Sequence, residues 1–216
     1  MANIKIGRMV LSMCQTNCYF VYREGSADAI VIDPADNGDR IYAALQKNGF
    51  NVTGILLTHG HFDHIWGCEA LKEAVNAEAA EPVKVYAGEA EEPLLNDAGK
   101  NISRQAGRAC TLQADVYLKD GEEVTLADMT FKVIATPGHT PGGVCFYFEE
   151  AGLLVCGDTL FLESVGRTDF PGGSMSTLVR SIREKLFVLP EDTLCYPGHG
   201  DSTTIAHEKQ YNPFLG

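Results

Sequence analysis

Thr58-His59-Gly60-His61-Phe62-Asp63-His64 is the stretch around which the rest of the chain is organised. The apolar run Ile55-Leu56-Leu57 precedes it and predicts a strand, because a short continuous apolar run fits a strand buried on both faces. Apolar residues at helical spacing over 65–75 predict an amphipathic helix after it. The stretch is therefore predicted to be a loop that joins a buried strand to a helix.

Four side chains of this loop are of types that bind metal ions in proteins. His59 and His61 are two residues apart in an extended loop, so both can point at one position. Asp63 and His64 lie where the chain turns into the helix, and they can point at a second position close by. Imidazole and carboxylate groups suit zinc, iron(II) or manganese. A His-x-His pair alone is common, whereas His-x-His-x-Asp-His after a buried strand is a specific signal for a metal site.

Composition and charge narrow the class of protein. The 216 residues are 45% hydrophobic and 21% charged, which is typical of a globular chain with one sizeable core. The net charge of −12 disfavours nucleic acid and anionic membranes as partners, because both are negatively charged. We expect a cytoplasmic protein, since no apolar run is long enough to span a membrane and residues 1–10 lack a signal-peptide core. Seven cysteines without Cys-x-x-Cys pairs do not fit a disulfide framework or a zinc ribbon.

Hydrophobic periodicity predicts the remaining elements. Strands are predicted at 4–10, 18–22, 29–33, 83–87, 123–126, 129–135, 144–148, 153–156 and 193–196, and helices at 39–48, 176–187 and 203–210. The order of strands and helices falls into two similar halves, which predicts two packed sheets with helices on the outer faces, an α+β fold. No repeat or linker divides the chain, so we expect one domain over residues 1–216.

Lys100, Arg104 and Arg108 form a local basic stripe in this acidic chain. They follow one another at spacings of four, with no acidic residue between Asp97 and Asp115. On a helix, the three side chains would share one face. Two interpretations stay open: a solvated surface, or an anion-binding rim above the metals.

Two further histidines occupy Pro-Gly-His turns that follow predicted strands. They are His139 in Thr136-Pro137-Gly138-His139 and His199 in Tyr196-Pro197-Gly198-His199. Asp158 also follows a predicted strand. Loops at strand ends can bring such side chains together on a rigid scaffold. His207 lacks this context and is predicted to lie on the surface.

The motifs THGHFDH, TPGHTPGG, GDTLF and YPGHG together resemble those of the metallo-β-lactamase superfamily over nearly the whole chain. GDTLFLESVGRTDFPGG and GHGDSTTIAHEKQYNPFL are most similar to short glyoxalase II-like, or hydroxyacylglutathione hydrolase-like, proteins. The resemblance implies an αββα sandwich with mixed or mostly antiparallel sheets. It also implies two divalent metal ions between the sheets at one edge, with zinc expected and iron or manganese as alternatives.

The superfamily pattern gives each matching residue a role. It implies that the first metal is held by His59, His61 and His139, the second by Asp63, His64 and His199, and that Asp158 bridges both. Asp33 resembles the family's aspartate that steadies the site, and the alternative is a simple turn former. A β-lactamase would be expected to carry a different residue at position 158 and a secretion signal.

The resemblance implies hydrolysis of a thioester such as a hydroxyacylglutathione or lactoylglutathione. Two dications, Asp63, Asp158 and a bridging hydroxide leave a charge of about +1, so an anionic substrate is attracted despite the acidic chain. The metals would lower the pKa of bound water to about 7, and the hydroxide would attack the acyl carbon. Asp63 and Asp158 are the predicted catalytic carboxylates. A thiolate can leave without a strong general acid, which suits a thioester better than an amide.

Arg167 stands where glyoxalase II enzymes carry a basic residue for the glycine carboxylate of glutathione. The alternative is a structural ion pair with an acid such as Asp169. The sequence departs from full-length glyoxalase II in two ways that bear on the thiol carrier. It ends at Gly216, without the C-terminal helical domain that supplies most glutathione contacts, and Asp169 replaces an aromatic residue.

Two other functions stay open. One is a persulfide dioxygenase-like oxidoreductase, a family with a similar Gly-Arg-Thr-Asp-Phe stretch that uses one iron held by two histidines and one aspartate. The other is a metal-binding protein that is not catalytic or that acts on another small ester or lactone. The sequence makes no prediction of the oligomeric state.

Overall fold

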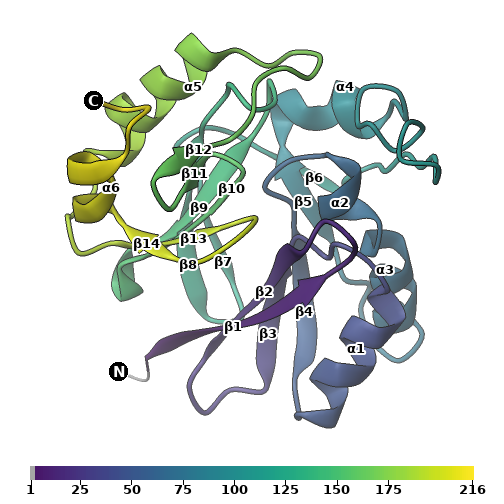
Figure 1. Cartoon of the computed structure of the whole chain (residues 1–216). Helices are drawn as coiled ribbons and strands as arrows, with labels where there is room; N and C mark the ends of the chain where they lie inside the picture. The colour runs from purple at the N-terminus through teal and green to yellow at the C-terminus, as the bar shows by residue number, and fades with distance from the viewer. Residues whose placement is uncertain (1–2) are drawn as a thin grey trace.

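The computed structural model describes residues 3–216, in which two six-stranded sheets pack face to face with helices outside them (Figure 1). The first sheet has the order β1 (Ile4–Leu11), β2 (Thr16–Arg23), β3 (Asp28–Ile32), β4 (Asn51–Leu56), β5 (Val85–Gly88), β6 (Val116–Leu118). The second has the order β14 (Thr203–Thr204), β13 (Leu194–Pro197), β10 (Leu153–Gly157), β9 (Val144–Phe148), β8 (Met129–Ala135), β7 (Glu123–Leu126). Strands β11 (Leu160–Phe161) and β12 (Ser164–Val165) form a small hairpin. The predicted αββα sandwich is confirmed.

The helices are short and lie on the outer faces of the two sheets. On the first sheet they are α1 (Gly38–Lys47), α2 (Phe62–Ile65), α3 (Cys68–Asn76) and α4 (Glu92–Leu95). On the second they are α5 (Met175–Ser181), continued by a π-helical turn (Ile182–Leu186), and α6 (Ile205–Tyr211). Two 3-10 turns, Glu89–Glu91 and Glu149–Ala151, complete the helical segments. No helix within residues 3–216 has the length and apolar character needed to cross a bilayer.

Strand pairing in the first sheet is mixed, as expected. Strands β1, β2 and β3 pair antiparallel through short turns. Strands β3, β4, β5 and β6 pair parallel. Parallel neighbours need a long crossover, and α1 provides it between β3 and β4, while α2 and α3 provide it between β4 and β5.

Apolar residues fill three layers, one between the sheets and one under the helices of each sheet. Tyr19, Ile30 and Phe146 belong to the layer between the sheets. Leu71 packs in the layer beneath α1 and α3, and Leu178 in the layer beneath α5. Because the central strands are covered on both faces, they read in the sequence as continuous apolar runs rather than alternating ones.

The helix predicted over 65–75 is interrupted in the structure, and the segment with the basic stripe does not form the helix that would align its cations. The predicted helix over 65–75 is broken between α2 and α3, where the Gly67 N–H donates to the Pro34 carbonyl. A Cβ at Gly67 would lie 2.6 Å from that oxygen, so the backbone at position 67 approaches Pro34 too closely for any residue with a side chain. The helix is interrupted at this close approach. The segment with the basic stripe forms turns, with Ile102 and Gly107 at positive φ, so its three cations do not share a helix face.

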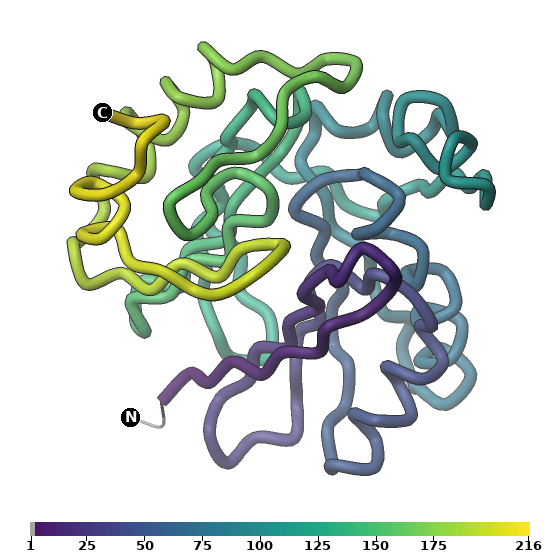
Figure 2. The backbone as a smooth tube through the Cα atoms, viewed as in Figure 1, coloured from purple at the N-terminus to yellow at the C-terminus, as the bar shows by residue number. Residues whose placement is uncertain are grey.

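The sheets place their loops at one shared edge. Strands β3 and β4 are parallel, and so are β10 and β13, so the carboxyl ends within each pair lie together. Figure 2 shows the turn between β1 and β2 beside the loop that follows β13, where the Asn17 N–H donates to the Gly198 carbonyl at 2.7 Å. This edge contains the loops with the predicted metal ligands.

Candidate metal centre

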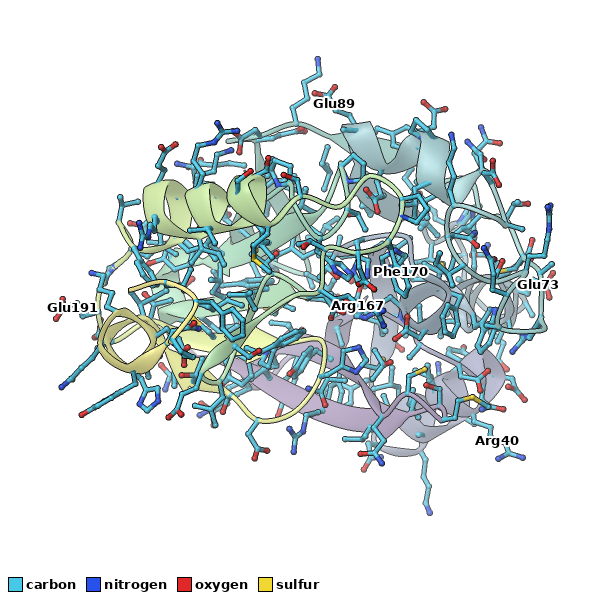
Figure 3. The ribbon with its side chains drawn as sticks, turned by 45° about the horizontal axis from the view of Figure 1, so that its top comes forward. Arg40, Glu73, Glu89, Arg167, Phe170 and Glu191 are labelled. Atoms are coloured by element: carbon cyan, nitrogen blue, oxygen red, sulfur yellow. The ribbon has the colours of Figure 1, made fainter. Side chains whose placement is uncertain are left out.

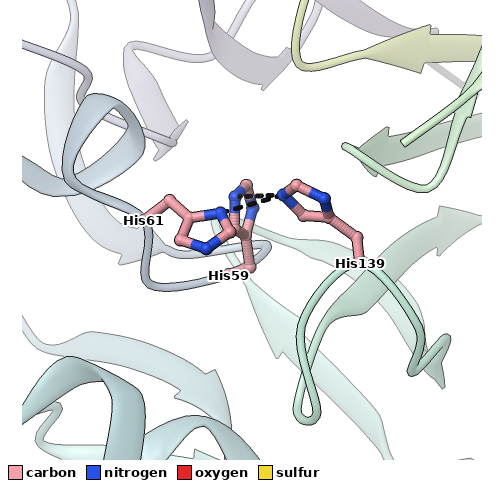
Figure 4. Close-up of side chains that lie close together, drawn as sticks. All are labelled: His59, His61 and His139. Atoms are coloured by element: carbon pink, nitrogen blue, oxygen red, sulfur yellow. Dashed lines mark hydrogen bonds between the residues drawn. The ribbon is translucent and has the colours of Figure 1, made fainter. Parts of the chain in front are cut away.

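Three histidines from two loops converge on one position (Figure 4). His59 and His61 come from the loop after β4, and His139 comes from the loop between β8 and β9. The His139 Nε2 lies 2.9 Å from His61 Nδ1 and 3.2 Å from His59 Nε2. All three side chains are buried. Each therefore presents a ring nitrogen to the same small volume.

A second group lies beside the first. Asp63 and His64 belong to α2, and His199 follows β13. The Asp63 Oδ2 is 3.3 Å from His199 Nε2 and 3.9 Å from His64 Nε2. Asp158, which follows β10, lies between the two groups, with carboxylate oxygens 3.4 Å from His64 Nε2, 3.5 Å from His139 Nε2 and 3.6 Å from His199 Nε2. The structure thus brings all seven predicted residues together around two neighbouring positions.

Hydrogen bonds from the opposite ring nitrogen orient the candidate ligands. The Nδ1 atoms of His139 and His199 donate to the carbonyls of Arg167 and Cys14, at 2.7 and 3.1 Å. The His64 Nδ1 donates to Asp33 Oδ2 at 2.9 Å. These bonds assign the proton of each ring to Nδ1 and leave Nε2 as a lone pair aimed into the site.

The donor set fits metal ions. The lone pairs of His59 and His139 face each other, which is repulsive unless a cation lies between them. Within residues 3–216, the His64 Nε2 and Asp158 Oδ1 are among the buried atoms without a hydrogen-bond partner. A Cβ at Gly198 would lie 2.3 Å from Asp158 Oδ1, so only glycine lets the backbone pass this close. Buried polar atoms need partners, and two cations would supply them here.

Electrostatics favour neutral His59 and His61 beside an ionised Asp158. Burial and the neighbouring His139 lower the pKa of His61 to about 3. Burial and His64 lower the pKa of His59 well below its usual value. The pKa of Asp158 lies well below its usual value because the neighbouring His64 outweighs the effect of burial. Neutral His59 and His61 beside the ionised Asp158 favour the binding of a cation.

The sequence profile of the metallo-beta-lactamase superfamily matches residues 11–199. This span contains all seven candidate ligands, and His199 is its last residue. The chain belongs to this superfamily. Relatives include an uncharacterized protein of Aquifex aeolicus (40% identity, 93% of this chain and 92% of that one) and the probable metallo-hydrolase YqgX of Bacillus subtilis (36%, 98% of both). Hydroxyacylglutathione hydrolase GloC of Haemophilus influenzae is 34% identical over 93% of both chains.

Solved structures of the superfamily agree with the fold. The BLEG-1 B3 metallo-beta-lactamase superposes with a TM-score of 0.90 at 36% identity, over 98% of this chain and 99% of that one. TTHA1623 in a di-iron-bound form gives 0.83 at 34% identity, over 97% and 100%. ETHE1 from Myxococcus xanthus gives 0.78 at 30% identity, over 97% and 83%.

The candidate metal centre of this superfamily protein opens into a cleft of about 440 Å³. Phe62, Phe161 and Phe170 line it together with Arg167 and five of the seven candidate ligands. A hollow of about 500 Å³ lies elsewhere, between Asp120 and Pro190, but the clustered histidines and aspartates line the smaller cleft. The cleft at the candidate metal centre is therefore the candidate substrate site.

Arg167 lies beside Phe170 in Figure 3, with its guanidinium carbon 3.9 Å from the ring centre. It also donates two hydrogen bonds to Asp169, at 2.7 and 2.6 Å. This is the ion pair that the sequence left open as an alternative. The pairing leaves Arg167 on the wall of the cleft, where a substrate group can still reach it.

The other predicted residues lie outside the cleft. Arg108 lies over the Trp66 ring and pairs with Asp36 at 2.9 Å. This member of the basic stripe is therefore engaged in contacts within the fold. Lys100 and Arg104 are exposed and do not line the cleft. His207 is bound to Glu163 at 3.0 Å on the surface, as predicted.

Asp33 lies outside the group of seven and contacts His64 directly. It is buried, adopts φ 52°, and accepts hydrogen bonds from His64 Nδ1 and from both the N–H and the hydroxyl of Thr58, at 2.8 and 2.6 Å. The Thr58 hydroxyl in turn accepts from His59 Nδ1 at 3.2 Å. Asp33 thus orients one histidine directly and another through Thr58.

Asp33→Ala should weaken metal binding about 10- to 100-fold, as for other residues that orient a ligand histidine. The physical reason is that His64 loses the acceptor that fixes its proton on Nδ1. Metal affinity measured by competition with a chelator checks this. The exposed Asp39, six residues on, offers Asp39→Ala as a matched control that should bind metal normally. Equal affinities for the two variants would refute the role of Asp33.

Proposed function

We propose that this protein is a hydrolase that uses two metal ions, zinc or iron, to cleave a thioester of the hydroxyacylglutathione type. The observation that carries the proposal is the convergence of His59, His61 and His139 beside Asp63, His64 and His199, with Asp158 between the groups. The name of the Haemophilus influenzae relative, hydroxyacylglutathione hydrolase, supports the substrate class. The di-iron form of TTHA1623 supports iron as the alternative to zinc.

The proposed chemistry is acyl transfer to water. Two divalent ions held there would lower the pKa of a bound water and polarise the acyl carbonyl. Asp63 is held by the Thr16 hydroxyl at 3.2 Å and can accept a proton from the attacking water. Besides the candidate ligands, the described residues that line the cleft include no carboxylic acid or lysine. A leaving group that departs as a thiolate fits such a cleft, because it needs no strong acid.

Arg167 is proposed to bind a carboxylate on the thiol carrier. Its partner Asp169 is exposed, and exposed ion pairs stabilise little, so a substrate carboxylate can take the place of Asp169. The hydrogen bonds from Arg167 lower the pKa of Asp169 to about 2, so Asp169 stays ionised and competes for Arg167 at any working pH. The pair therefore sets how strongly the cleft attracts an anionic carrier.

Arg167→Ala should raise KM about ten-fold for a carboxylate-bearing thioester, because it removes hydrogen bonds between charged groups. A neutral thioester should keep its KM. The companion variant Asp169→Asn should lower KM for the anionic substrate, since it removes the competing carboxylate. Steady-state kinetics on both substrates measure these shifts. If both substrates respond alike to Arg167→Ala, Arg167 is structural.

A persulfide dioxygenase is the second candidate, favoured by the Gly166–Phe170 stretch and by the likeness to ETHE1. The test compares four reactions of the metal-loaded protein: lactoylglutathione hydrolysis, a neutral thioester, a β-lactam, and oxygen uptake with glutathione persulfide. The proposal predicts thioester cleavage that is lost on chelation and restored by metal. Oxygen uptake or β-lactam cleavage as the dominant activity would contradict it.

A further inference from the structure

One buried carboxylate joins the two loops that supply the first group of histidines. Glu91, at the end of the 3-10 turn after β5, is fully buried. Its Oε1 accepts from the Gly60 N–H at 2.9 Å, and its Oε2 accepts from the Gly142 N–H at 2.8 Å. Gly60 lies between His59 and His61, and Gly142 lies three residues after His139. A single side chain thus spans the gap between the two loops.

The fold holds Glu91 tightly between these loops. A Cβ at Gly142 would lie 2.1 Å from the Glu91 backbone nitrogen, so this loop packs directly on the Glu91 backbone. A Cβ at Gly60 would meet Leu94 and Leu95 at 2.8 Å, so the other loop packs against α4. Burial raises the pKa of Glu91 to about 7, opposed by the Gly60 N–H, the Thr140 side chain and the Gly142 N–H. A buried ionisable group is costly, and its hydrogen bonds offset part of that cost.

We propose that Glu91 is a positioning residue that sets the spacing of the His59–His61 loop and the His139 loop, and thereby the affinity of the first metal position. The inference rests on the proposed metal assignment, and it is independent of the substrate. Loss of one acceptor would leave a buried backbone N–H unpaired, and that loop would move to find another partner. The three histidine nitrogens would then no longer meet at one point.

The second metal position is held by other contacts. His64 is oriented by Asp33, His199 by the Cys14 carbonyl, and Asp63 by the Thr16 hydroxyl. None of these three contacts includes Glu91. The role of Glu91 is therefore asymmetric: a change there weakens the first position and spares the second.

Glu91→Gln is the sharpest test, because it keeps the size of the side chain but leaves one oxygen to accept from two N–H groups. Titration of the metal-free variant with Zn²⁺ against a chromophoric chelator should show one of two ions bound about 10- to 100-fold more weakly, with the other unchanged. Glu89→Gln is the matched control, since Glu89 lies on the same turn but points to the solvent (Figure 3). It should bind both ions as the unmodified protein does.

A purely structural role would give a different pattern. Both affinities would fall together, in step with the urea midpoint of the metal-free protein, or neither would change; either result would overturn the proposal. If Glu91→Gln does not fold, Glu91→Asp keeps the charge with a shorter arm, and the same asymmetric loss is expected at smaller size. The test measures metal affinity and not thioester cleavage. A protein without thioesterase activity would therefore count against the proposed function but would not affect the proposed role of Glu91.

Discussion

Asp158→Ala should lower kcat/KM for the thioester by about 10³-fold, because metal catalysis supplies several kcal/mol and each 1.36 kcal/mol is ten-fold in rate. Asp158 lies within 3.4–3.6 Å of histidines from both groups, so its loss should affect both metal positions. Its removal also takes away a negative charge that faces these histidines. We therefore expect metal content to fall at both positions along with the rate.

The control for Asp158→Ala is Asp201→Ala. Asp201 is an exposed carboxylate shortly after His199, and its contact with Arg8 at 3.7 Å does not reach the cleft. Elemental analysis and steady-state kinetics on the two variants give the comparison. Retention of both metals by Asp158→Ala, or a rate within ten-fold of the unmodified protein, would show that Asp158 does not bridge the two positions.

Chelation should lower the thermal midpoint by about 8–16 °C. A ligand present at about 1,000 times its Kd stabilises the folded state by about 4.1 kcal/mol. For a chain of this size, each kcal/mol shifts Tm by about 2–4 °C. Thermal unfolding with and without a chelator measures the difference. A midpoint that does not move on chelation would mean that no ion binds to the folded state preferentially.

The same difference should depend on pH in a defined direction. In the metal-free protein, burial lowers the pKa of His64, but the neighbouring Asp158, Asp33 and Asp63 outweigh burial and raise it well above 6.5. Protonated His64 thus stabilises the metal-free fold at low pH, and this contribution is lost as pH rises through the raised pKa. Metal binding needs neutral His64. The midpoint difference should therefore grow with rising pH, and a difference that shrinks would contradict this assignment.

The sequence was most informative where ligands stand close together or follow strands directly. The loop with His59 and His64 is a short continuous motif, and the Pro-Gly-His turns at His139 and His199 follow strands whose apolar runs are easy to recognise. These patterns can be recognised in the sequence because the strands that precede them are covered on both faces and are therefore continuous apolar runs. The layer order of the fold could be predicted for the same reason.

Contacts between distant loops could not be predicted. Glu91 stands among other glutamates in the sequence, and nothing local shows that it meets Gly60 and Gly142 across the fold. The interruption of the helix at Gly67 could not be predicted, because it depends on the close approach of the Pro34 carbonyl and not on helical periodicity. Strand β6 could not be predicted because it is only three residues long and lies at a sheet edge.

Metal analysis of the purified protein tests the central claim most directly. The account predicts two divalent ions per chain, removal of both by a chelator, and loss of thioester cleavage in step with their removal. A protein that holds one ion or none while cleaving thioesters at full rate would contradict it.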